Sequence, residues 1–148
     1  METFDLLKRL TETPGPSGNE DAVAAVVAEL WRPLVDEVAV DRVGSLVATR
    51  RGAGAEPRPT ILLAAHADEL GLMVTRIVDQ RGQGFLRLTN LGGVDRRHLL
   101  GQTAVVHGRE ALTGVLGGLP DSMLPDGARG QAYSYDNLVL DVGLPTDR

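Results

Sequence analysis

The stretch Thr60–Gly71, TILLAAHADELG, joins an apolar run to side chains that carry chemistry. Ile61–Ala65 is too short for an independent helix, and we interpret it as a strand buried on both faces, of the kind found inside a parallel sheet. His66 and Asp68 follow its carboxyl end, where residues i and i+2 point to the same side. We therefore expect this pair in the crevice where open α/β sheets bind their ligands.

The residue types of this pair indicate half of a metal site. The imidazole of His66 is a good ligand for a divalent transition metal, and the carboxylate of Asp68 can bind the metal or orient the ring. Glu69 is expected to point to the opposite side and to have a structural or salt-bridging role. The alternative is a polar strand end, in which the pair caps a neighbouring helix or faces solvent.

Composition excludes several classes of function. The formal charge of −5 over 148 residues argues against nucleic acid or an anionic membrane as a partner. The absence of cysteine excludes disulfides, thiolate metal sites and a cysteine nucleophile. No apolar run has the length of a membrane span, and the N-terminus lacks the features of a signal peptide. The sequence therefore predicts a soluble, cytoplasmic protein.

Two helices and a hairpin are predicted before the central stretch. The first helix covers Phe4–Glu12. Ser17 and Glu20 fit a capping box that starts a second helix, and Pro33 ends it. Two extended segments then form an antiparallel hairpin, Glu37–Asp41 and Ser45–Arg50.

After Gly71 the pattern changes to short β-type segments separated by glycine and proline. These segments are Leu72–Val78, Gly84–Leu88, Thr103–Val106, Leu112–Leu116 and Leu138–Val142. No helical periodicity accompanies them, which is typical of a small β-barrel or sandwich. The sequence thus predicts two domains, residues 1–72 and 73–148.

Four motifs occur in the order found in one known family. They are AAHADELGLMV (64–74), LTNLGGV (88–94), GVLGGLP (114–120) and LVLDVG (138–143). With the N-terminal LLKRLTETPGPSGNED, the chain resembles the tetrahedral metalloaminopeptidases. This family comprises glutamyl, leucyl and deblocking aminopeptidases, some of them formerly labelled endoglucanase or cellulase M.

The resemblance implies the α/β fold class: an incomplete zinc-peptidase-type α/β/α sandwich followed by a β-barrel-like dimerisation domain. It implies two divalent metal ions, zinc or cobalt, with His66 as a metal ligand and Asp68 as the catalytic acid that orients it. The implied reaction is removal of N-terminal residues from short peptides. The implied partner is a second copy of the chain, with a dimer expected and larger tetrahedral assemblies known in the family.

The chain also departs from the family pattern. The bridging aspartate, the adjacent Glu-Glu pair, a further aspartate and the final histidine have no counterpart, and the sequence contains no Glu-Glu pair at all. Asp136-Asn137 resembles the bridging-aspartate motif, but its context, SYDNLVLDVG, matches the last barrel strand, so we reject it as a ligand. We therefore expect the chain alone to be inactive, with metal bound weakly or not at all.

Two alternatives to the aminopeptidase remain open. The first is a non-catalytic self-association module, and the second is the endoglucanase of the old family label, which would require two carboxylates flanking a saccharide cleft. His98 and His107 are expected at the surface, outside any metal site. Gly92-Gly93 is expected to form a tight turn, because no helix N-terminus follows to make it a phosphate loop.

Overall fold

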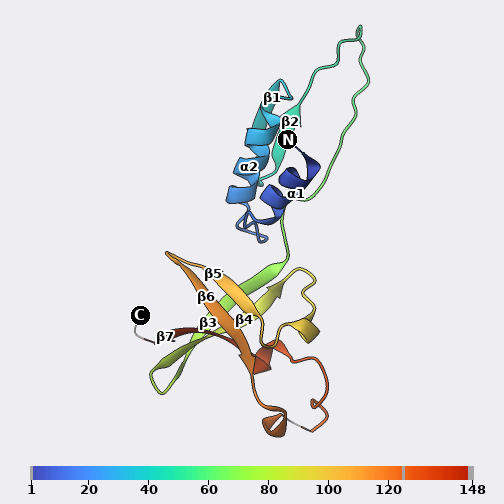
Figure 1. Cartoon of the computed structure of the whole chain (residues 1–148). Coiled ribbons are helices and arrows are strands. Elements are labelled where there is room, and N and C mark those ends of the chain that lie inside the picture. The colour runs from blue at the N-terminus through green and yellow to red at the C-terminus, as the bar shows by residue number, and fades with distance from the viewer. Residues whose placement is uncertain (1, 125, 147–148) are drawn as a thin grey trace. The chain divides into compact units, whose positions relative to one another are not determined.

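The computed structural model describes residues 2–124 and 126–146 and divides into two compact units, residues 1–69 and 70–148. The first unit contains helices α1 (Thr3–Thr11) and α2 (Asp21–Trp31) and a two-stranded antiparallel hairpin, β1 (Glu37–Val40) with β2 (Leu46–Thr49) (Figure 1). These elements confirm the helices and the hairpin expected from the sequence. No helix in the described part of the chain is long and apolar enough to cross a membrane.

Local contacts explain where these elements start and stop. Arg9 and Glu29 form an ion pair at 2.5 Å that joins α1 to α2. In the hairpin turn, Asp41 Oδ1 accepts hydrogen bonds from the backbone N–H groups of Val43 and Ser45, as turn aspartates commonly do. The predicted capping box was wrong: Glu20 occupies the N-cap position without capping the helix, and its carboxylate accepts from Gly18 N instead.

The prediction of a buried strand at Ile61–Ala65 was also wrong. Residues 60–68 form neither helix nor strand, and Ile61, Leu62 and Leu63 are 83%, 86% and 91% exposed. A central strand needs hydrogen-bonding neighbours on both edges and cover on both faces. None of the described residues pairs with this segment, so its apolar side chains stay in solvent.

The second unit is one curled antiparallel sheet of five strands in the order β3-β4-β7-β6-β5 (Figure 1). The strands are β3 (Gly71–Gln80), β4 (Gln83–Leu91), β5 (Thr103–His107), β6 (Ala111–Gly118) and β7 (Leu138–Pro145). They confirm all five β segments expected from the sequence. Among the described residues between the strands are the short 3-10 helices η1 (Arg96–His98), η2 (Asp121–Met123) and η3 (Tyr135–Asn137).

The two faces of this sheet differ in composition because neighbouring residues in a strand point to opposite sides. Leu88, Leu116 and Leu140 form the buried cluster on one face. Phe85, Arg87 and Val139 directly precede or follow inward-facing leucines along β4 and β7. They therefore point to the other face, where they line a pocket. The structure thus has a mixed α/β fold in which the leucine cluster holds the sheet together.

Candidate functional site

His66 and Asp68 lie together, as the spacing predicted, but not at the end of a buried strand in a crevice: the segment forms no strand, and the His66 side chain is 84% exposed. His66 Nδ1 is 3.0 Å from Asp68 Oδ1 and 2.9 Å from the Asp68 carbonyl oxygen. A proton on Nδ1 therefore has two acceptors, and Nε2 has no hydrogen-bond partner among the described residues. A histidine held at Nδ1 by a carboxylate presents Nε2 to a ligand, the arrangement typical of metal-binding histidines.

Glu69 connects this pair to the turn between the two helices. Its backbone N–H donates to the Gly15 carbonyl at 2.8 Å, and its side-chain Oε1 accepts from Gly15 N at 3.0 Å. Pro16 and Glu69 also form an isolated parallel β-bridge. Within the described residues, these are the hydrogen bonds that attach residues 60–69 to the rest of the first unit. Sequence reasoning assigned Glu69 a structural role but missed its partner.

The pair has few companions that could complete a metal site. Across residues 2–124 and 126–146, no group of three or more histidine or carboxylate side chains could hold a metal ion. His98 is exposed, with its Nε2 3.8 Å from Asp95 Oδ2, and His107 is exposed at the end of β5. The described residues therefore offer one imidazole ligand with its carboxylate, and they do not fit a two-metal centre by themselves.

Two other predictions concern the second unit. Asp136 and Asn137 lie in η3 immediately before β7, and the Asp136 carbonyl accepts a hydrogen bond from Arg87. Gly92 directly follows β4 with φ +74°, a conformation that favours glycine, and the Asn90 side chain donates to its carbonyl at 2.8 Å. The chain thus bends at Gly92, whereas the tight turn expected over Gly92-Gly93 is not formed.

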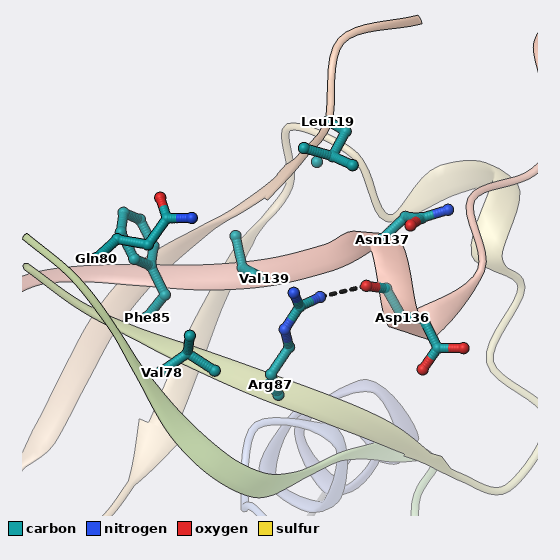
Figure 2. Close-up of a pocket in the computed structure, with 9 residues that line it drawn as sticks. Val78, Gln80, Phe85, Arg87, Leu119, Asp136, Asn137 and Val139 are labelled. Atoms are coloured by element: carbon teal, nitrogen blue, oxygen red, sulfur yellow. Dashed lines mark hydrogen bonds between the residues drawn. The ribbon is translucent and has the colours of Figure 1, made fainter. Parts of the chain in front are cut away.

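The structure shows one feature that sequence reasoning missed. A pocket of about 200 Å³ lies on the face of the sheet opposite the leucine cluster, with Arg87 at its base (Figure 2). Strand alternation could have indicated that Phe85 and Arg87 share this face. Other lining residues come from the end of β6, from η3 and from the start of β7. These segments lie far from β4 in the sequence, and the sequence pattern does not bring them together.

Comparison with known proteins assigns the family. Residues 44–148 match the model of the M42 glutamyl aminopeptidases. The chain is 31% identical to the lysyl aminopeptidase of Pyrococcus furiosus over 146 residues, which is 97% of this chain and 40% of the relative. The chain belongs to the M42 glutamyl aminopeptidase family, whose members depend on metal ions.

Two solved structures support the same assignment. The TET aminopeptidase from a marine sediment archaeon, Thaumarchaeota archaeon SCGC AB-539-E09, superimposes with a TM-score of 0.83 at 35% identity, covering 96% of this chain and 38% of that one. PhTET1-12s, described as a dodecamer, gives a TM-score of 0.75 at 33% identity, covering 97% and 40%. The chain therefore spans about two fifths of the length of each of these three relatives.

Proposed function

We propose that this chain contributes to a metal-dependent aminopeptidase, with His66 as a metal ligand and Asp68 as the acid that orients it. The observation that carries the proposal is the contact between His66 Nδ1 and Asp68 Oδ1 at 3.0 Å, which leaves Nε2 available. A bound divalent metal would supply Lewis-acid polarisation of a peptide carbonyl. The family membership and the aminopeptidase relatives support this reaction class.

The residues of this chain have two tasks in the proposed site. Asp68 accepts a hydrogen bond from Nδ1–H, which fixes the ring orientation and raises the basicity of Nε2. Glu69 ties the segment to Gly15, so that the pair keeps its place relative to the turn before α2. The remaining ligands and the general base have no counterpart among the described residues, so the chain alone is proposed to be inactive.

We assign the two parts of the chain accordingly. Residues 1–72 are proposed as the N-terminal part of the catalytic α/β domain, and residues 73–148 as a β-barrel-like dimerisation domain. The oligomeric TET relatives support self-association, and a homodimer is the proposed basic assembly. Short peptides are the proposed substrates.

Zinc titration of the full chain, followed through its histidine ring resonances, tests the metal role. The His66 resonances should shift at the lowest zinc concentrations. Asp68→Asn should weaken this binding about 10- to 100-fold, because the ring loses its carboxylate partner. His98→Ala is the matched control and should leave the His66 response unchanged. If all three histidines respond together, or if His66 does not respond, the assignment is wrong.

A peptidase assay tests the wider proposal. Aminoacyl-p-nitroanilides are incubated with the chain and added zinc or cobalt, after its intact mass of 15.7 kDa has been verified. We expect no turnover from this chain alone. Metal-dependent turnover that His66→Ala abolishes would contradict the proposed inactivity and would show that association of copies completes the site.

A non-catalytic self-association module is the second candidate. It is favoured by the lack of a cluster of three metal-binding side chains in the described residues. If zinc binding at His66 fails while the chain still forms a defined oligomer, this second candidate becomes the function of the polypeptide.

A further inference from the structure

Arg87 lies half-buried on β4, on the face of the sheet opposite the leucine cluster. Its Nη1 donates to the carbonyl oxygens of Asp136 and Leu138, the latter at 3.3 Å. These bonds fix the guanidinium against the junction of η3 and β7. Figure 2 shows the other terminal nitrogen, Nη2, turned toward Val139 at the pocket wall.

The positive charge of Arg87 has no ion-pair partner among the described residues. Figure 2 shows the Asp136 carboxylate turned away from it. Arg87 Nε is buried and has no hydrogen-bond acceptor. The cation on the pocket wall, rather than this buried nitrogen, is the group that an anionic ligand can reach and balance.

The acidic residues on neighbouring strands have other partners. Asp79 accepts hydrogen bonds from Thr146 Oγ1 and from Gly82 N. Asp141 Oδ1 accepts from Gly143 N at 2.8 Å and from the Gln83 side chain at 3.4 Å. Neither of these carboxylates forms an ion pair with Arg87.

The walls of the pocket set the second requirement for that ligand. Apolar side chains form most of the lining, and two amide side chains accompany them. The apolar residues are Val78, Phe85, Leu119 and Val139, and the amides belong to Gln80 and Asn137; Asp136 also lines the pocket, with its carboxylate turned away from Arg87 (Figure 2). A cavity of about 200 Å³ that combines apolar walls with one cationic donor fits a small amphipathic anion.

We propose that the Arg87 pocket binds a carboxylate that carries a small aliphatic group, such as the C-terminal residue of a peptide. The carboxylate would accept from Nη2, forming a charge-assisted hydrogen bond in a partly desolvated site. The aliphatic group would contact Val78, Phe85 and Val139. Inorganic phosphate carries no apolar group, so it gains nothing from these walls.

The test uses the full chain, uniformly labelled with ¹⁵N, and three probes. N-acetyl-leucine carries both required groups, N-acetyl-leucinamide lacks the charge, and inorganic phosphate lacks the apolar group. We expect saturable amide shifts at Arg87, Leu119 and Asn137 with N-acetyl-leucine, and affinity lower by about tenfold or more for the other two probes. Equal responses to the amide or to phosphate, or no response to N-acetyl-leucine, would overturn the proposal.

Substitutions locate the site without removing Arg87, whose loss would also free two backbone carbonyls. Leu119→Asp places a competing carboxylate at the pocket wall and should lower affinity about tenfold or more. Met123→Asp introduces the same charge at an exposed position outside the pocket lining and should leave affinity unchanged. Undiminished binding by a folded Leu119→Asp, or an equal loss in Met123→Asp, would place the binding elsewhere and contradict the proposal.

Discussion

The α-carbon of Gly15 has no room for a side chain. A Cβ at this position would lie 2.6 Å from Val23 Cγ1, and Val23 is a buried residue of α2. The same glycine exchanges both of its backbone hydrogen bonds with Glu69. One residue therefore determines how closely the segment with His66 approaches the turn before α2.

Gly15→Ala should accordingly destabilise the first unit. Relief of the clash requires movement of Val23 or of the turn, so we expect a loss of about 1–3 kcal/mol in the free energy of unfolding, measured by urea denaturation. Gly54→Ala is the matched control, because a Cβ there meets nothing within 4 Å. If the free energy of unfolding falls no more than in Gly54→Ala, the turn accommodates the added methyl group without loss of stability.

Asp95 provides a residue-scale prediction about pH. Hydrogen bonds from the Arg97 side chain, and then from its backbone N–H, hold the pKa of Asp95 well below its ordinary value of 3.8. Because the folded-state pKa is depressed, the stabilisation by this contact is present above pH 3.8 and is lost as pH falls through the folded-state pKa.

Carboxyl ¹³C NMR should show Asp95 still ionised at pH values where an ordinary aspartate is half protonated. In Arg97→Gln the pKa of Asp95 should rise part of the way towards 3.8, because the backbone donor remains when the guanidinium is removed. An unchanged midpoint in this variant would show that the guanidinium does not cause the shift.

At the scale of elements, two apolar segments differ in outcome: β7 is part of a sheet, whereas Ile61–Ala65 pairs with no described strand. Leu138 and Leu140 are buried on β7, which pairs with β4 on one side and with β6 on the other. Ile61–Ala65 has comparable apolar character but no neighbour in the described chain. Hydrogen-bonding partners, rather than apolar content, separate these two outcomes.

Hydrogen exchange should report this contrast directly. Amides of residues 61–65 should exchange at nearly unprotected rates, whereas the paired amides of β7 should be the slow ones. The measurement is native-state exchange followed by NMR or mass spectrometry. Strong protection across residues 61–65 would mean that another copy or another segment supplies the missing sheet neighbours.

For the molecule as a whole, the exposed apolar segment is expected to promote association between chains. Ile61, Leu62 and Leu63 together form an exposed apolar stretch of the kind through which chains associate. The relative PhTET1-12s is described as a dodecamer, and the exposed stretch leads us to expect association of this chain.

Sedimentation velocity should therefore show concentration-dependent association in the micromolar range. Leu62→Glu should reduce the part of this association that uses the segment, because it places a charge in the middle of the exposed run. Val43→Glu, at an exposed position in the hairpin turn, serves as the control. A monodisperse monomer in the unmodified chain would contradict the expectation, and equal behaviour of the two variants would assign association to another surface.

Local patterns in the sequence by themselves determined the two helices, the hairpin, the five β segments and the proximity of His66 to Asp68. Each of these depends on periodicity, turn residues or a spacing of two, all of which act within a few residues. Only the tertiary structure determined that Ile61–Ala65 is exposed, that Glu69 forms hydrogen bonds with Gly15, and that a pocket surrounds Arg87. These three depend on partners distant in the chain: a strand is buried only where others pair with it, and a charged side chain lines a pocket only where remote segments close around it.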